Sequence, residues 1–175
     1  YPLAHRNGVR SFAVHSHATA YSDSRLRSVR NWLVCRNIGA YSDVRLACSR
    51  AAGDFLFGRG RYEEVPNAID VETYRFKEPV RADVRARLGL GDTPVVGHVG
   101  RFSEQKNHRF LIDVYTELAR LRPEARLMLI GDGPLRPGIE EIVAERGLTD
   151  RVLFLGDRGD VAALYQAMDM FLLPS

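Results

Sequence analysis

The stretch from residue 94 to residue 134 decides the fold and reads PVVGHVGRFSEQKNHRFLIDVYTELARLRPEARLMLIGDGP. It opens on an apolar run that ends at Gly100, and a second apolar run follows at Leu127 to Ile130. Between them, from Phe110 to Leu121, apolar residues recur at the spacing of one helical face until Pro123 interrupts the pattern. Strand, helix and strand in this order predict a parallel βαβ unit.

The ends of these two predicted strands form a candidate ligand site, because ligands of parallel sheets bind beyond the carboxyl ends of the strands. Both ends finish on glycine, at Gly100 and Gly131, which lets backbone approach a ligand closely. Arg101 and Lys106 follow the first strand and face the start of the helix predicted near Asn107. Two cations and a helix N-terminus suit a phosphate or pyrophosphate, whereas spacing alone leaves a solvated turn equally open.

The use of lysine favours the phosphate interpretation. The chain has 25 basic residues, and only Lys77 and Lys106 among them are lysines. An ammonium is a compact point charge, whereas a guanidinium is a planar fork. A lysine at this turn in a chain so rich in arginine therefore suggests a role that the point charge fulfils.

The rest of the chain continues the alternation of short strands and helices that is typical of an α/β fold. We predict strands at 9–14, 43–48, 63–66, 151–155 and 169–173, and helices at 25–40, 49–57, 135–146 and 160–167. Ser49 and Asp160 are the predicted N-caps, and Gly147 is the predicted stop of the helix before it. Residues 71–92 are charged and contain Pro79, so we interpret them as a connection with one short helix at 81–88 and place the domain boundary near residue 75.

Composition narrows the class of protein. A hydrophobic content of 45% and a charged content of 27% are ordinary for a soluble globular protein. No apolar run approaches the ~20 residues of a membrane-spanning helix. Cys35 and Cys48 are too few for a disulfide framework or a metal site, so a cytoplasmic location is expected. The chain starts at Tyr1 without Met, and we expect it to be a fragment.

Charge is distributed unevenly along the chain. Residues 1–62 contain ten Arg and three Asp, a net charge of +7, whereas the remainder has a net charge of −4. A basic first segment suits peripheral contact with an anionic membrane surface at the inner face of the plasma membrane, and dispersed solvated arginines are the alternative. Aromatic and basic residues do not interleave as they do in single-strand binders, so no nucleic-acid partner is expected.

Three segments carry a resemblance to a known family: GRFSEQKNHRFLI at 100–112, LMLIGDGP at 127–134 and RVLFLGDRGDVAALYQAMDMFLLPS at 151–175. They closely resemble the donor-binding domain of retaining GT-B glycosyltransferases of family 4, most of all the branch that builds capsular and exopolysaccharides. The resemblance runs from about Val9 to Ser175. It implies a GT-B fold with two Rossmann-like parallel-sheet domains, both incomplete in this chain.

The resemblance also implies a division into domains. Residues 1–75 would form the C-terminal part of the acceptor-side domain, and 76–92 the interdomain linker. Residues 93–175 would form the donor-nucleotide-binding domain, truncated at its C-terminal end. Relatives continue into a segment with two glutamates eight residues apart that contact the donor sugar and the ribose. Because this chain ends at Ser175, we expect it to be inactive alone.

The implied reaction transfers a sugar from a nucleotide diphosphate sugar, with a UDP-sugar favoured, to a lipid-linked or polysaccharide acceptor. By resemblance the reaction retains stereochemistry. Arg101 and Lys106 match the Arg and Lys of the family's G-R-x4-K turn, which bind the donor diphosphate and stabilise charge on the leaving group. No metal and no cofactor besides the donor is expected, since the chain has no DxD or His/Cys cluster.

The resemblance implies further contacts. Gly131 to Pro134 match a loop near the nucleotide, in which Asp132 alternatively caps the following helix. Phe154 and Leu155 match a segment that brackets the base, and plain core is the equal alternative. The predicted catalytic residues are thus Arg101, Lys106 and His15. The predicted substrate-binding residues are Gly100, Arg101, Lys106, Asn107, Gly131, Asp132, Gly133, Pro134, Phe154 and Leu155.

His15 is the one predicted catalytic residue outside the donor half, because it resembles a histidine that contacts the donor sugar. His17 competes with it for this role, and a structural hydrogen bond is the plain alternative for either. Asn67 and Asp70 resemble the stretch at the interdomain crossing, although Ala68 replaces the usual glycine there.

Two other functions remain open at this level. A sugar-nucleotide 2-epimerase shares the GT-B architecture, but that group lacks the turn that carries Arg101 and Lys106. A non-catalytic module that binds a nucleotide, or docks on a membrane through residues 1–62, is the second.

Overall fold

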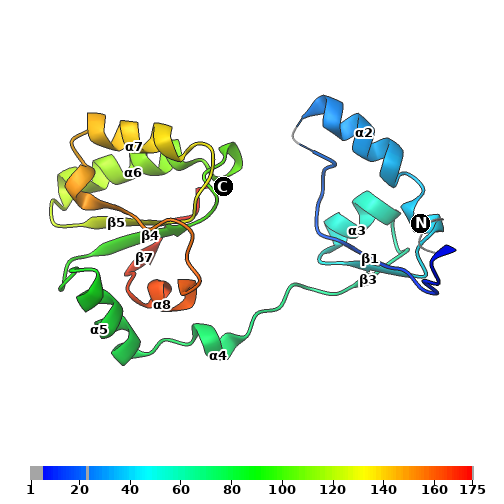
Figure 1. Cartoon of the computed structure of the whole chain (residues 1–175), viewed down its shortest axis with the longest axis horizontal. Coiled ribbons are helices and arrows are strands. Elements are labelled where there is room, and N and C mark those ends of the chain that lie inside the picture. Colours follow the sequence, from blue (N-terminus) through cyan, green and yellow to red (C-terminus); the bar gives the residue numbers. More distant parts are fainter. Residues whose placement is uncertain (1–5, 23, 175) are drawn as a thin grey trace. The chain divides into compact units, whose positions relative to one another are not determined.

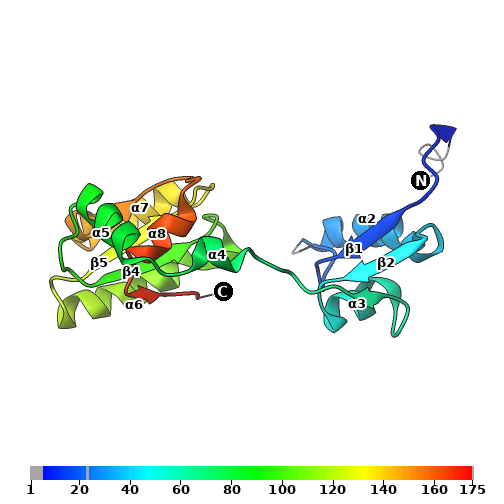
Figure 2. The ribbon, with the colours of Figure 1, turned by 90° about the horizontal axis from the view of Figure 1, so that it is seen from below.

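The computed structural model describes residues 6–22 and 24–174 and divides into two compact units, Tyr1–Ile69 and Asp70–Ser175 (Figures 1 and 2). Each unit is built on one sheet, and every strand pair in both sheets is parallel. The predicted α/β class with two parallel sheets is therefore confirmed. None of the described helices is long and apolar enough to cross a membrane.

The first unit has a three-stranded sheet in the order β1 (Ala13–Ser16), β2 (Val44–Ala47) and β3 (Glu63–Glu64). The helices placed in its described residues are α2 (Arg25–Cys35), the 3-10 turn η1 (Ile38–Ala40) and α3 (Arg50–Phe57). As predicted, the Ser49 hydroxyl caps α3 by accepting the N–H of Ala52. The strand predicted at 9–14 begins later, because pairing starts where the Phe12 carbonyl accepts the N–H groups of Asp43 and Val44. The helix predicted to reach residue 40 ends at Cys35.

The second unit has a four-stranded sheet in the order β6 (Val152–Phe154), β5 (Arg126–Ile130), β4 (Val95–Val99) and β7 (Met170–Phe171). Helices α6 (His108–Leu121) and α7 (Arg136–Glu145) cover one face of this sheet (Figure 1). Helices α5 (Glu78–Arg87) and α8 (Val161–Gln166) cover the other face. The short helix α4 (Val71–Tyr74) and the 3-10 turns η2 (Glu104–Lys106) and η3 (Thr149–Arg151) complete the unit.

The alternation of buried residues along β5 explains this two-layer packing. Leu127 and Leu129 face the α6–α7 layer, whereas Met128 and Ile130 face the α5–α8 layer. All four side chains are at most 1% exposed. Successive side chains of a strand point to opposite faces, so a continuous apolar run requires cover on both.

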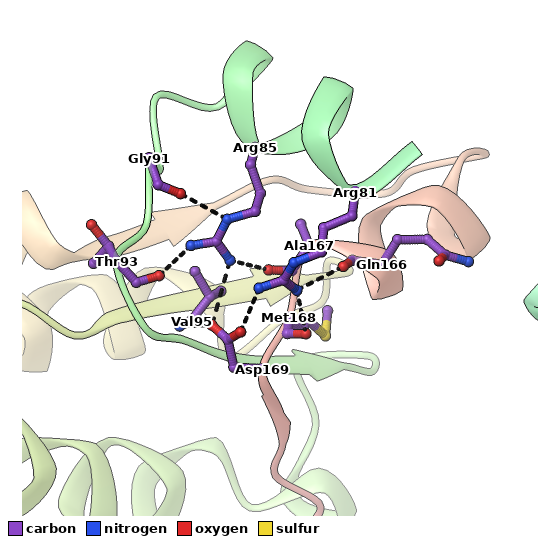
Figure 3. Close-up of polar contacts among 9 residues, drawn as sticks. All are labelled: Arg81, Arg85, Gly91, Thr93, Val95, Gln166, Ala167, Met168 and Asp169. Carbon is purple, nitrogen blue, oxygen red and sulfur yellow. Dashed lines mark hydrogen bonds and ion pairs between the residues drawn. The ribbon is translucent and has the colours of Figure 1, made fainter. Parts of the chain in front are cut away.

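Residues 76–92, which the sequence suggested as an interdomain linker, lie within the second unit. Arg85 in α5 is only 7% exposed and donates to the carbonyls of Gly91, Thr93 and Ala167 (Figure 3). Arg81, one helical turn earlier in α5, donates to the carbonyl of Gln166. These contacts fix α5 to the rest of the unit, and the division between the units falls after residue 69 rather than near residue 75.

Asp169 is the acidic partner of both arginines. It pairs with Arg81 at 2.5 Å and with Arg85 at 3.4 Å, and accepts the N–H of Val95 at 2.7 Å (Figure 3). Pro79, whose presence suggested a connection, lies in the first turn of α5, where a proline needs no N–H partner.

Candidate functional site

The loops that follow β4 and β5 are joined to each other by backbone hydrogen bonds. The N–H of Phe102 donates to the backbone carbonyl of Asp132 at 3.0 Å, and the N–H of Leu135 donates to the backbone carbonyl of Phe102 at 3.2 Å. The N–H of Gly131 donates to Gly156, which follows β6, at 2.8 Å. Three neighbouring strand ends therefore form one connected edge, as expected for a parallel sheet.

The glycines of the loop 131–134 are required by this packing. A Cβ on Gly131 would lie 2.3 Å from the carbonyl oxygen of Gly100, and φ of Gly131 is +125°. A Cβ on Gly133 would lie 2.5 Å from the carbonyl oxygen of Phe102. The sequence suggested close approach to a ligand as the reason for these glycines. The structure supplies a second reason, close approach of one loop to another.

Arg101 and Lys106 lie in the loop 100–107, which runs from the end of β4 to α6. Arg101 is exposed and Lys106 is half-buried at the end of η2. Among the described residues, no carboxylate forms an ion pair with either side chain. In contrast, Arg136 pairs with Asp132 and Glu140, and Arg158 pairs with Asp160. Two cations at the carboxyl edge thus remain available to an anionic ligand.

Asn107 joins this loop to α6 in a left-handed conformation, with φ 48° and ψ 47°. Within the described residues it is the one non-glycine with positive φ, which asparagine tolerates better than most residues. Its side chain makes no capping hydrogen bond to α6. The first amides of this 14-residue helix therefore start beside Lys106, and the positive end of the helix adds to the two cations.

A pocket of about 180 Å³ lies next to this helix start, between α6 and α7. It is lined by Ser103, Glu104, Asn107, His108, Arg109, Leu135, Gly138 and Ile139. Of the predicted site residues, only Asn107 takes part in it.

Two buried histidines lie beneath the loop 100–107, and sequence reasoning did not single them out. His98 in β4 is 0% exposed and His108 in α6 is 2% exposed, with ring centroids 4.8 Å apart. The ring of Phe102 stacks on His108 at 4.0 Å. The signal for His98 was available in the sequence, since a histidine interrupts the apolar run VVGHV.

Burial sets the protonation of both histidines. Burial lowers the pKa of His98, and the nearby Lys106 charge lowers it further, against the opposing hydrogen bond to Leu172. The pKa of His108 is lowered to about 4, chiefly by burial and then by His98 and Lys106. Both rings are therefore neutral at pH 7. The positive charge of the loop 100–107 therefore comes from Arg101 and Lys106, and the exposed Glu104 is its acidic residue.

The remaining predicted contacts in this unit have structural partners. Asp132 accepts the N–H of Gly133 at 2.6 Å and pairs with Arg136, whereas α7 starts after Leu135 without a side-chain cap. The alternative that Asp132 caps this helix is therefore wrong. Asp160, predicted to cap α8, pairs with Arg158 instead and makes no capping bond.

Phe154 and Leu155 lie at the carboxyl end of β6 and are partly buried on opposite faces of the sheet. Phe154 packs against the α6–α7 core, and the guanidinium of Arg136 lies 5.8 Å from its ring centroid. Leu155 packs against the α5–α8 core and donates its N–H to Leu129. Both residues thus contribute to packing, and their contact with a base stays a prediction. Pro134 is exposed in the loop after Gly133.

His15 and His17 belong to the first unit. His15 is the third residue of β1, His17 follows the strand, and both side chains are exposed with ring centroids 4.1 Å apart. Ser16 between them is buried and donates its hydroxyl to the carbonyl of Ala52. Of the two residues predicted at the interdomain crossing, Asn67 is exposed, and Asp70 caps α4 by accepting the N–H of Glu72.

Comparison with known proteins gives one family and a consistent group of relatives. The family described as "Glycosyl transferases group 1" matches residues 93–175. EpsF of Bacillus subtilis, which carries a glycosyltransferase name, is 35% identical over 96% of this chain and 46% of EpsF. The GDP-mannose-dependent alpha-(1-6)-phosphatidylinositol monomannoside mannosyltransferase of Mycolicibacterium smegmatis is 32% identical over 99% of this chain and 46% of its own length. The chain therefore spans about half the length of the curated relatives it matches.

Solved structures agree with these relatives. The crystal structure of Anabaena HepE in complex with UDP and glucose superposes with a TM-score of 0.79 at 26% identity, over 95% of this chain and 46% of HepE. The complex of HepE with UDP-glucose gives a TM-score of 0.78. The model of the glycosyl transferases group 1 family thus matches residues 93–175, and the chain has the fold of GT-B glycosyltransferases.

Proposed function

We propose that the intact protein transfers a sugar from a nucleotide diphosphate sugar, a UDP-sugar foremost, to a lipid-linked or polysaccharide acceptor. In this reaction the bond between the sugar and the diphosphate breaks, and a bond to an acceptor hydroxyl forms as that hydroxyl loses its proton. The observation that carries the proposal is the pair Arg101 and Lys106, which have no carboxylate partner among the described residues and lie beside the start of α6. Charge on the leaving nucleoside diphosphate is what such a pair stabilises.

Several finer points belong to this proposal and rest on the resemblance. We propose family 4 membership and retention of stereochemistry at the sugar. Metal-independent transfer is proposed because Arg101, Lys106 and the helix N-terminus can together stabilise the diphosphate. The division into an acceptor-side first unit and a donor-side second unit is proposed likewise, as is a role of His15 in contacting the donor sugar.

Lys106→Ala is the variant that tests the donor site. Titration calorimetry of UDP, GDP and ADP into the intact protein is expected to find one nucleoside diphosphate that binds. We expect Lys106→Ala to lower its affinity by about tenfold or more, since a charge-assisted contact of about 1.5–3 kcal/mol is lost. Turnover is expected to fall by a larger factor if the charge acts on the transition state.

Lys77→Ala is the matched control. It removes the same side chain and the same charge from an exposed position in the same unit. The hydrogen bond from Lys77 to the side-chain oxygen of Gln166 is made by the backbone N–H, which alanine keeps. Affinity is expected to stay within about twofold of the wild type. The proposal would be refuted if both lysine variants lost affinity for the diphosphate equally. It would also be refuted if the wild type bound none of the three diphosphates.

We also propose that α2 contacts an anionic membrane surface, where a lipid-linked acceptor would be found. This helix has no buried residue, and its exposed apolar side chains are Leu26, Val29, Trp32, Leu33 and Val34. It also carries three arginines, Arg25, Arg27 and Arg30, and Arg36 follows its last residue. Apolar and basic residues on one helix are typical of interfacial helices.

Sedimentation with phosphatidylglycerol vesicles tests this surface. Binding is expected at low salt and should weaken as salt is raised, because each exposed charge is screened. The double variant Arg25→Gln/Arg27→Gln should bind less than the control Arg59→Gln/Arg61→Gln, which removes the same charge elsewhere in the first unit. Equal binding of both double variants would argue against a role of α2.

A further inference from the structure

The ring of His98 makes one hydrogen bond with the residues that the structure describes, and the chemistry of this bond fixes the tautomer of the ring. The Nδ1 atom lies 2.8 Å from the carbonyl oxygen of Leu172, which can only accept, so Nδ1 carries the hydrogen. Because burial keeps the ring neutral, Nε2 carries a lone pair. Nε2 is buried and has no hydrogen-bond partner among the residues that the structure describes.

The Nε2 edge of the ring lies directly beneath the loop 100–107. A Cβ placed on Gly100 would be 2.8 Å from Nε2 of His98. The Cγ and Cδ atoms of Lys106 would both be 3.4 Å from the same point. The imidazole and the stem of Lys106 thus meet at Gly100, and the lack of a side chain at this glycine lets them do so.

The Nδ1 edge faces a different segment. Leu172 follows β7, the strand next to β4 in the sheet, and the ring of Phe171 in β7 stacks on His98 with 6.1 Å between centroids. One side chain of β4 therefore touches the chain that leaves β7 and the loop that leaves β4. Both strand ends belong to the edge at which ligands of parallel sheets bind.

We propose that His98 is a positioning residue for donor binding, which holds the Gly100–Lys106 loop in register with the segment after β7 through its bond to Leu172. The inference rests on the proposed function, because it assigns the loop to the donor diphosphate. In this role the ring touches no substrate. A histidine that merely filled the core would affect stability and leave the affinity of the folded protein for diphosphate unchanged.

Three substitutions at position 98 separate these roles. His98→Asn places an amide N–H close to the position of Nδ1 and can restore the bond to Leu172. His98→Gln extends its amide toward the position of Nε2, and His98→Leu keeps apolar volume without any donor. We expect affinity for the nucleoside diphosphate that the wild type binds, among UDP, GDP and ADP, to fall by about tenfold in the Leu and Gln variants. The Asn variant should recover most of this loss.

Thermal melting of each variant provides the second readout. If affinity follows melting temperature and the Asn variant binds no better than the Gln variant, the positioning role is wrong. Wild-type affinity in His98→Leu would overturn it as well. If the wild type binds none of the three diphosphates, the proposed function fails first, so the two failures are distinguishable.

A double-mutant cycle with Gly100→Ala tests the contact itself. The added methyl would press on Nε2 of His98 and on the Lys106 stem, so Gly100→Ala alone should weaken diphosphate binding. In the His98→Asn background the smaller side chain leaves room for the methyl. We therefore expect the loss of diphosphate affinity caused by Gly100→Ala to be smaller by about threefold or more in this background. Such non-additivity is typical of residues in contact. Additive effects would show that the two positions are not coupled and would count against the proposal.

Discussion

Gly131 illustrates how a single residue sets the distance between two loops of the candidate site. Its positive φ and its contact with the Gly100 carbonyl leave no space for a side chain. We expect Gly131→Ala to lower the free energy of unfolding by about 2 kcal/mol or more, because strain and a backbone clash add. Denaturant titration of the folded protein measures this loss.

Gly138→Ala is the matched control for that substitution. Gly138 lies in α7 without a positive φ, and a Cβ added there would have no atom within 4 Å outside its own stretch of helix. Alanine at this position should stabilise the helix by up to about 1 kcal/mol. An equal loss of stability in both variants would mean that the backbone at Gly131 does not specifically require glycine.

His108 makes stability depend on pH at the scale of one side chain. Its pKa is lowered to about 4 in the folded protein, whereas an unfolded chain binds the proton near pH 6.5. Between these values the unfolded state binds more protons, so stability falls as pH drops from about 6.5 toward 4 and is level above. At pH 5 this loss is about 1–2 kcal/mol.

The substitution His108→Leu should remove this part of the pH dependence. Denaturation midpoints measured at pH 7 and at pH 5 should differ less in the variant than in the wild type. An unchanged difference would show that His108 is protonated in the folded protein with an ordinary pKa.

At the scale of elements, Asp169 joins α5 to the sheet. Its carboxylate binds Arg81, Arg85 and the N–H of Val95 in β4. Asp169→Asn should lower the free energy of unfolding by about 1–3 kcal/mol, since two arginines lose their common acidic partner. The control Asp83→Asn removes an exposed carboxylate that pairs with Arg87 within α5. It should lower the free energy of unfolding by less than about 0.5 kcal/mol. Denaturant titration of both variants measures the two losses, and equal losses would contradict a special role of Asp169.

The pH dependence of this network has a definite sign. Burial alone would raise the pKa of Asp169, but the Val95 N–H and the charges of Arg81 and Arg85 together lower it. A carboxyl with a lowered pKa stabilises the fold above its unfolded pKa of about 3.9 and loses that contribution as pH falls through the lower folded value. The stability gap between the wild type and Asp169→Asn should therefore narrow below about pH 4. A constant gap would contradict the lowered pKa.

At the scale of the whole molecule, the second unit begins at Asp70. Val84 and Leu90 are at most 2% exposed and belong to its α5–α8 core. We expect the segment 70–175 to fold cooperatively and the segment 93–175 to be several kcal/mol less stable, because burial of one such side chain contributes about 1.5–3 kcal/mol. Thermal melts of both segments, followed by circular dichroism, test this boundary. Equal melting temperatures would favour a boundary after α5.

Much of the second unit could be predicted from local sequence. The apolar runs that became β4 and β5, the one-faced pattern of α6 and the stop at Gly147 all depend on residues near in the chain. The loop with Arg101 and Lys106 was predictable for the same reason, since strand ends and charges can be read directly. The first unit was predicted less well at its boundaries, because β1 and β2 each have one buried residue, whereas β4 and β5 each have four and so form continuous apolar runs.

The sequence by itself determined the parallel α/β class, the order of elements around residues 94–134 and the cations at the end of β4. Only the tertiary structure decided that α5 belongs to the second unit, because Arg81 and Arg85 find their partners more than 80 residues away. It also revealed His98 beneath the loop, since the partner carbonyl at Leu172 lies 74 residues further along the chain. Local patterns report the preferences of nearby backbone, whereas such contacts exist only once distant strands have paired.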